Sequence, residues 1–338
     1  MYLERKFHPV GQGLFCTERF STNEGQPPFF NIIYDCGTLN SQYLVNNAIA
    51  AEFGLLTDRK VDIDFVFISH FHADHISGLD TLQKYCNIKE YIIPALSTER
   101  IVEAYIYNII HGSSSVNRVL VRFANQNVEG VRQIGEQDDI SHLSHEIPYW
   151  LIKPYMPADS KQEKLKEELN KKGFSGLWNA FDSRDFAAVD SMMGQMGREG
   201  RKKLKTAYDN AYGGDHKYML TLYSGYNEPK VELEECNALY CGDYEAADNN
   251  AVIALTDPLN NRWPMIGTLQ VPHHGSKYNN CQELYDAERH CVISYGNSHY
   301  KHPHIETIKY ILNAQNGKAL ETLHLVNANT GFSQQLTI

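Results

Sequence analysis

Four potential metal ligands lie close together in the stretch FISHFHADHISGL, residues 67–79. They are His70, His72, Asp74 and His75. Imidazole and carboxylate together suit zinc, manganese or iron. In an extended segment His70 and His72 can point the same way, which leaves Asp74 and His75 for a second position. We predict a metal site in this stretch.

The segments on either side of the cluster predict how it is held. VDIDFVFISH has the apolar and β-branched residues of a buried strand, and SGLDTLQKY has those of a helix. The cluster would therefore occupy a strand-to-helix loop. Ligands collect at such strand ends in open α/β folds, because side chains converge there without entering the core.

The motif HFHADH matches the H-x-H-x-D-H signature of the metallo-β-lactamase (MBL) superfamily, and the preceding serine and following ISGL also resemble it. The resemblance implies an α/β fold, the αββα sandwich, in which loops at one edge of two facing sheets hold one or two metals. It does not specify the substrate, since that fold hosts lactamases, thioesterases, lactonases, nucleases and phosphodiesterases.

The resemblance also implies ligands from later loops. GGDHKYMLTLYSG is similar to the glycine-rich turn, histidine and strand that supply the third ligand, which would be His216; His145, in SHLSHEIPYW, is the competing residue. ALYCGDYEAAD is similar to the strand ending in Gly-Asp whose aspartate bridges two metals, here Asp243. A carboxylate suits bridging because its two oxygens can face two cations.

Two motifs near the C-terminus, LQVPHHGSKYN and VISYGNSHYKHPHIETI, resemble the hydrolase domain of the ComEC family of DNA-uptake proteins. The opening VGQGLFCTERF and NIIYDCGT resemble the same group. By analogy with RNA-processing members of the superfamily, His302 would be the last ligand, and His273 or His274 would stabilise the phosphate or protonate the leaving oxygen. The alternative makes one of this histidine pair a ligand and His302 structural.

The implied site holds two divalent ions, Zn²⁺ or Mn²⁺. The first ion would be bound by His70, His72 and His216, and the second by Asp74, His75 and His302, with Asp243 bridging the two. Asp74 would also orient the bridging water. Weaker candidates for substrate contacts are Ser276, Lys277 and Asn297. Such a centre acidifies a shared water to hydroxide and neutralises charge on substrate oxygens, which favours a phosphodiester in DNA, RNA or a nucleotide.

Two other functions stay open at this stage. The first is hydrolysis of a carbonyl substrate by a thioesterase or lactonase using the same hydroxide. The second is a partner-dependent, metal-stabilised component of a nucleic-acid processing or defence system. A cleavage panel of phosphodiester, thioester and lactone separates the first from a nuclease.

Beyond the site, β-like runs alternate with helical segments, which indicates α/β layers. The segment from about 157 to 215 differs: DSKQEKLKEELNKKGF and the basic SMMGQMGREGRKKLKTAYDNAYGG predict helices. We predict one domain over residues 1–338, with a mostly helical insertion there that could dock a protein partner or gate the site.

Composition limits the classes of function. The formal charge of −10 argues against an extended nucleic-acid-binding surface but not against a nucleic-acid substrate at a metal site. No stretch has the roughly 18 apolar residues of a membrane span, so we expect no membrane association and a cytoplasmic location. The seven scattered cysteines contain no C-x-x-C pair, and we expect reduced thiols.

Overall fold

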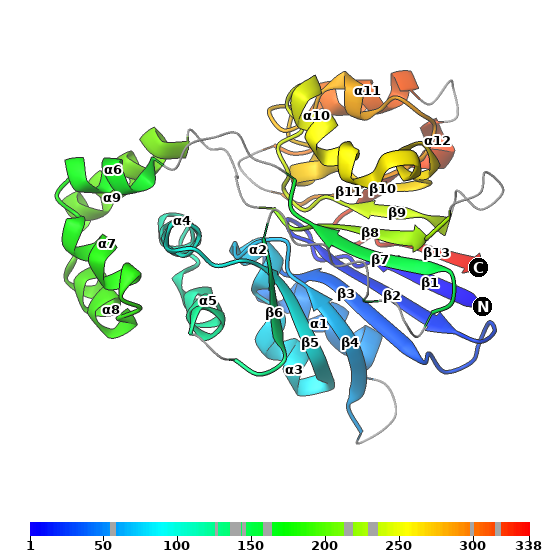
Figure 1. Cartoon of the computed structure of the whole chain (residues 1–338), viewed down its shortest axis with the longest axis horizontal. Helices are drawn as coiled ribbons and strands as arrows, with labels where there is room; N and C mark the ends of the chain where they lie inside the picture. Colours follow the sequence, from blue (N-terminus) through cyan, green and yellow to red (C-terminus); the bar gives the residue numbers. More distant parts are fainter. Residues whose placement is uncertain are drawn as a thin grey trace.

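Two mixed β-sheets face each other and carry helices on their outer faces (Figure 1). The computed structural model describes residues 1–54, 59–125, 128–135, 143, 147–157, 164–212, 219–228, 236–297, 301–314 and 319–338. Within these residues the arrangement confirms the predicted αββα sandwich.

The first sheet has the strand order β13-β1-β2-β3-β4-β5-β6 over the described residues. Strands β13, β1, β2 and β3 pair antiparallel, and β3 to β6 pair parallel. The bounds are β1 Tyr2–Phe7, β2 Phe15–Ser21, β3 Phe30–Cys36, β4 Val61–Phe67, β5 Cys86–Pro94, β6 Val131–Ile134 and β13 Phe332–Thr337.

The second sheet repeats this plan, with the order β12-β11-β10-β9-β8-β7 among the described strands. Strands β7, β8 and β9 pair antiparallel, and β9 to β12 pair parallel. The bounds are β7 Trp150–Tyr155, β8 Thr221–Tyr226, β9 Ala238–Tyr240, β10 Thr268–Gln270, β11 His290–Ser294 and β12 Leu323–Val326.

Three layers of apolar packing hold the sandwich together. Aromatic and aliphatic side chains from both sheets, such as Phe20, Phe67 and Trp150, fill the space between the sheets. One outer layer joins the first sheet to α1 Gln42–Phe53, α2 Ala73–Ile76, α3 Leu79–Tyr85, α4 Thr98–Ile110, η1 Ser114–Val116 and α5 Asn117–Ala124. The other joins the second sheet to α10 Asn249–Thr256, η3 Asp257–Met265, η5 Gln282–Leu284 and α11 Ile305–Ala314, with α12 Ala319–Thr322 beside β12.

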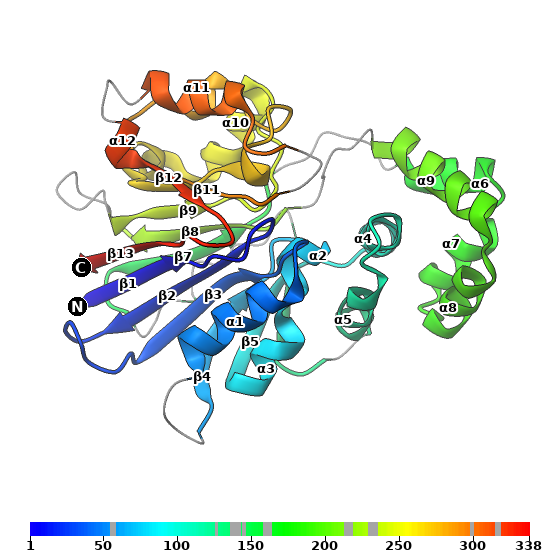
Figure 2. The same ribbon diagram turned by 180° about the vertical axis from the view of Figure 1, so that it is seen from behind.

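In the segment for which an insertion was predicted, the described residues form four helices: α6 Leu165–Lys171, α7 Ser175–Asp182, α8 Phe186–Gln195 and α9 Arg198–Tyr212. They lie at one end of the molecule beside α4, away from the two sheets (Figures 1 and 2). Helices α6, α7 and α9 contact α4. Buried residues such as Leu165, Phe181 and Leu204 belong to the same apolar cluster as α4, so these helices are part of the packed fold.

One ion pair is enclosed between the sheets. Arg5 on β1 and Glu18 on β2 face each other in register, and Arg5 Nε donates to Glu18 Oε1 at 2.7 Å. Both side chains are almost fully buried. The guanidinium also donates to Cys236 O, and Glu18 accepts from the hydroxyls of Ser224 and Tyr240. The pair therefore connects the first sheet to the second.

The described residues contain no helix long and apolar enough to cross a membrane. No disulfide joins the seven cysteines, all of which lie among the described residues.

Candidate metal centre

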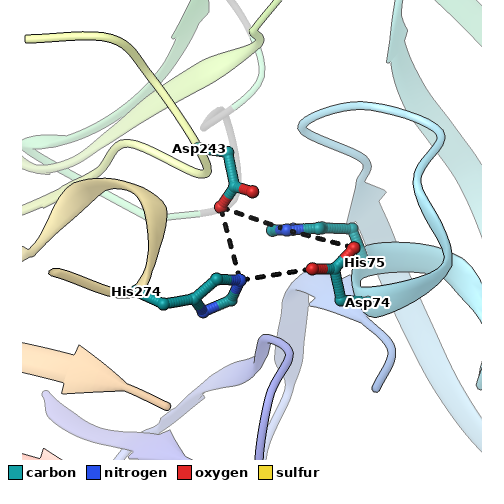
Figure 3. A group of neighbouring side chains, drawn as sticks. All are labelled: Asp74, His75, Asp243 and His274. Atoms are coloured by element: carbon teal, nitrogen blue, oxygen red, sulfur yellow. Dashed lines mark hydrogen bonds and ion pairs between the residues drawn. The ribbon is translucent and has the colours of Figure 1, made fainter. Parts of the chain in front are cut away.

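Strand ends from both sheets meet at one edge of the sandwich. Strand β4 ends at Phe67, and the histidine-rich loop follows and turns into α2. From the facing sheet, β9 ends just before Asp243, and β10 ends just before η4 Pro272–Gly275. Figure 3 shows Asp74 and His75 on one side of the resulting cluster and Asp243 and His274 on the other.

The four side chains in Figure 3 form a buried group whose ligand atoms all lie within 4.8 Å of one another. His75 Nε2 is 3.2 Å from Asp243 Oδ1, and His274 Nε2 is 3.3 Å from Asp74 Oδ2. His274 Nε2 also lies 3.6 Å from Asp243 Oδ1. Two carboxylates and two imidazoles thus point at a shared centre.

A second group adjoins the first. One ligand atom each from His70, His72 and Asp74 lie within 4.8 Å of one another. His70 Nε2 is 4.0 Å from Asp243 Oδ2, the carboxylate oxygen other than the one facing His75 and His274. The Asp243 carboxylate therefore presents one oxygen to each group, the placement that bridging requires.

A buried aspartate orients two histidines. The Asp35 carboxylate accepts from His75 Nδ1, from the Ser69 backbone N–H and from Ser69 Oγ, each at 2.7 Å. Ser69 Oγ is also 3.0 Å from His70 Nδ1. With Nδ1 so occupied, Nε2 of each ring faces the cluster, as metal-binding histidines usually require.

His72 uses its other ring nitrogen, Nε2, for the supporting contact. Its Nε2 lies 3.0 Å from Glu103 Oε1, and its ring stacks on Tyr107 with centroids 3.5 Å apart and planes 9° from parallel. When Nε2 donates its proton to Glu103, Nδ1 is the ring nitrogen whose lone pair could bind a cation.

The second-sheet residues are positioned by backbone contacts. Gln270 Oε1 accepts from the N–H groups of Cys241 and Gly242, which fixes the turn before Asp243. Gly242 has φ +56, and a Cβ there would lie 2.7 Å from Ser69 Cβ, so the turn requires glycine. His274 Nδ1 donates to the Ser294 carbonyl at 2.8 Å, which turns Nε2 toward the carboxylates.

The opposed charges shift the pKa values of the cluster. Burial alone would raise the pKa of Asp74, but the neighbouring His75 and His274 outweigh it and lower that pKa to about 2. Burial likewise opposes the charged form of His75, yet Asp243, Asp35 and Asp74 hold its pKa well above the usual range. Asp243 and Asp74 raise the pKa of His274 against burial. The ionised carboxylates thus favour the protonated form of both imidazoles when no cation is bound.

The residues present fit a divalent cation. Asp74 Oδ1 and Asp243 Oδ1 are buried and accept no hydrogen bond from the described residues. The imidazoles are ion-pair partners of these oxygens, with His75 Nε2 3.2 Å from Asp243 Oδ1 and 3.9 Å from Asp74 Oδ1. A buried carboxylate oxygen that accepts no hydrogen bond is costly, and a cation between the two carboxylates would satisfy both oxygens. Imidazole and carboxylate suit zinc and manganese. The cluster is a buried His/Asp metal site.

The two histidines of η4 lie in different environments. His274 is 3% exposed and belongs to the cluster, whereas the His273 side chain is 16% exposed and has Nε2 3.7 Å from Asp243 Oδ2. His302 lies beside the pair, with its ring 5.7 Å from that of His273 and 6.4 Å from that of His274. Its Nδ1 is 3.2 Å from the His273 carbonyl oxygen. The geometry thus brings His274 into the cluster in the place proposed for His302.

The weaker candidates lie around this loop. Ser276 is buried, and its Oγ accepts from the Tyr278 N–H. Lys277 Nζ sits 5.0 Å from the Tyr278 ring centroid. Asn297 is exposed, and its carbonyl accepts from Asn40. His216 and His145, the two candidates for the third ligand, lie outside the described residues.

Sequence reasoning missed several positioning residues. Asp35 belongs to the stretch NIIYDCGT, where an apolar strand ends in a carboxylate, so the sequence carried a signal. Glu103 lies on the buried face of α4, and an acidic residue among apolar ones is the kind of signal that marks a paired charge. Gln270 and Tyr107 carry no local signal, because their partners are distant in sequence.

Part of the chain is similar to a known protein family. Residues 30–149 match the family model described as "Metallo-beta-lactamase superfamily". This segment contains the first histidine cluster and Glu103. A comparison with curated proteins finds no match.

Solved structures resemble the chain only distantly. A CmlA beta-hydroxylase mutant is 9% identical with a TM-score of 0.45, over 99% of this chain and 54% of that one, so the chain spans about half its length. Zn(2+)-bound PqqB from Methylobacterium extorquens is 9% identical with a TM-score of 0.45, over 100% of both chains. MEM-A1, a subclass B3 metallo-beta-lactamase from a soil metagenome library, is 9% identical with a TM-score of 0.33, over 83% of this chain and 81% of that one.

Proposed function

Because the chain has the α/β fold of the metallo-beta-lactamase superfamily and residues 30–149 match that superfamily, we propose that it is a metal-dependent phosphodiesterase acting on DNA, RNA or a nucleotide. The observation that carries the proposal is the buried Asp74 and Asp243 pair, ringed by imidazoles, with His273 more exposed beside it. Two divalent ions bound there would supply an activated water and neutralise charge on the substrate oxygens.

The ligand set follows the geometry. His70 and His72, with His216 as the third residue from the sequence motif, would hold the first ion. Asp74, His75 and His274 would hold the second, and Asp243 would contribute one oxygen to each. His302 then supports the histidine loop through its contact with the His273 carbonyl oxygen.

His273 is the residue we assign to the substrate. Its Nε2 lies near Asp243, but its side chain is more exposed than that of His274, so it can reach a phosphate oxygen from the edge of the site. There it would donate a hydrogen bond to the oxygen on which charge develops, or a proton to the leaving oxygen. A phosphodiester gains most from such a donor, because its transition state carries more anionic charge than that of a thioester or lactone.

A cleavage panel tests the substrate class. The purified protein should be supplied with Zn²⁺ or Mn²⁺ and given bis(p-nitrophenyl) phosphate, labelled single- and double-stranded DNA, RNA, a thioester and a lactone. We expect turnover of phosphodiesters that requires the added ion and stops with a chelator. Turnover of the thioester or lactone alone would assign the site to carbonyl hydrolysis, and two bound ions without any turnover would overturn the hydrolase proposal.

Metal binding should release protons. The carboxylates raise the pKa values of His75 and His274, so both rings keep their protons to a higher pH than a free imidazole when no cation is bound. A cation binds the neutral ring and displaces the proton. Affinity should therefore rise as the pH rises toward these pKa values. Calorimetric titration of the metal-free protein in two buffers of different ionisation enthalpy, at one pH, measures the release; equal heats in both buffers would contradict it.

A further inference from the structure

We propose that helix α9 of the insertion supports the first metal position. Its residue Tyr208 is a positioning residue that acts on His72 through Glu103. Tyr208 OH donates to Glu103 Oε1 at 2.7 Å, and the same oxygen lies 3.0 Å from His72 Nε2. This inference rests on the metal centre of the proposed function but not on its substrate.

The three residues form a buried chain from the insertion to the site. His72 is 1% exposed, Tyr208 4% and Glu103 8%. Burial and the charge of Glu103 hold the pKa of Tyr208 well above its usual range, so the hydroxyl keeps its proton and donates. Because Tyr208 donates to the oxygen that faces His72, it fixes where that oxygen sits.

The position of Glu103 Oε1 decides the direction of the His72 ring. The stack on Tyr107 fixes the plane of the imidazole, but a half-turn of the ring about its Cβ–Cγ bond would keep the same plane. The bond from Nε2 to Glu103 removes this freedom and selects the tautomer that presents Nδ1 to the site. A carboxylate on Nε2 also raises the basicity of the ligating nitrogen.

The same pair of helices contains a second tyrosine–glutamate contact, for which the described hydrogen bonds join α9 to α4 and α6. Tyr212 OH donates to Glu99 Oε1 at 2.7 Å, and this oxygen also accepts from the Leu165 N–H at 3.0 Å. Residues four apart share a face of a helix, so both contacts lie on one α4–α9 interface. One contact connects α9 to a histidine of the site, and the other connects it to α6. Tyr212 is therefore a matched control for Tyr208.

The test compares Tyr208→Phe with Tyr212→Phe and wild type, all prepared free of metal. Each variant loses one buried hydroxyl from the same interface, so both should fold and lose similar thermal stability. Co²⁺ titration followed by visible absorption, and Zn²⁺ titration against a chelating dye, measure each binding step. We expect Tyr208→Phe to weaken one of two steps by about 10- to 100-fold, the range found for outer-shell partners, and to alter the Co²⁺ spectrum of that step.

Tyr212→Phe should keep wild-type affinities at both steps. Glu103→Gln, which retains an oxygen acceptor but loses the charge, should weaken the same step as Tyr208→Phe. Wild-type binding by Tyr208→Phe, or an equal loss in Tyr212→Phe, would overturn the inference. A wild-type protein that binds neither ion would instead overturn the metal centre, and this inference with it.

Discussion

Asp243→Asn is expected to abolish both metal retention and hydrolysis. The substitution keeps the shape of the side chain but removes the charge, and Asp243 is the carboxylate whose two oxygens face the two ligand groups. An amide has one oxygen and an NH₂ group that would point toward a cation. We expect turnover to fall by at least about 10²- to 10³-fold, the loss that follows removal of one transition-state contact.

The measurement pairs metal content of the purified protein with turnover of the best phosphodiester in the panel. Asp248→Asn is the matched control: it makes the same change five positions along the chain, at the exposed residue that caps α10. That variant should keep its metal and its activity. If Asp243→Asn retains both ions and wild-type turnover, Asp243 does not bridge and the proposed site is wrong. Asp74→Ala should be run beside it, because Asp74 joins both groups.

Glu18→Ala is expected to be the most destabilising single substitution away from the site. It would leave the Arg5 guanidinium enclosed between the sheets without its carboxylate, while the hydroxyls of Ser224 and Tyr240 would lose their acceptor. Breaking a buried pair by removing one partner costs about 3–5 kcal/mol in the free energy of unfolding. Chemical denaturation followed by circular dichroism measures the change.

Two controls separate the causes of that loss. Asp209→Ala removes one partner of an exposed ion pair on α9 and should leave the denaturation midpoint unchanged. Removing both charges together, as Arg5→Met with Glu18→Leu, should recover much of the stability, because no unpaired charge then remains in the core. A Glu18→Ala midpoint equal to that of Asp209→Ala would show that the buried pair contributes little.

The local parts of the site follow from local sequence. The strand before His70 and the loop that carries His70 to His75 are encoded within about fifteen residues, so apolar patterning and ligand spacing predict them together. Asp243 and the η4 histidines likewise lie within a few residues of the end of a short buried strand. The helices within residues 165–212 were likewise predicted from helix-forming composition.

Which histidine completes the cluster depended on the tertiary structure. His273 and His274 are neighbours in sequence, yet only the backbone of η4, where both residues have positive φ, places one in the cluster and leaves the other more exposed. His302 lies in the same neighbourhood, but nothing in its local sequence fixes its distance from Asp74 or Asp243. Such distances depend on how the second sheet packs against the first.

Short stretches of sequence predicted the ligand types and their setting: a strand-end cluster of imidazoles and carboxylates on an α/β sandwich. Only the tertiary structure revealed what holds that cluster in place, namely Asp35 behind His75, and Glu103 and Tyr208 behind His72. The difference lies in how far apart in sequence the interacting residues are. Ligand types and strand patterns are properties of a few consecutive residues. The buried hydrogen-bond chain instead joins His72 to Tyr208, which lie 136 positions apart in the sequence. It forms only when the sheets and helix α9 pack together.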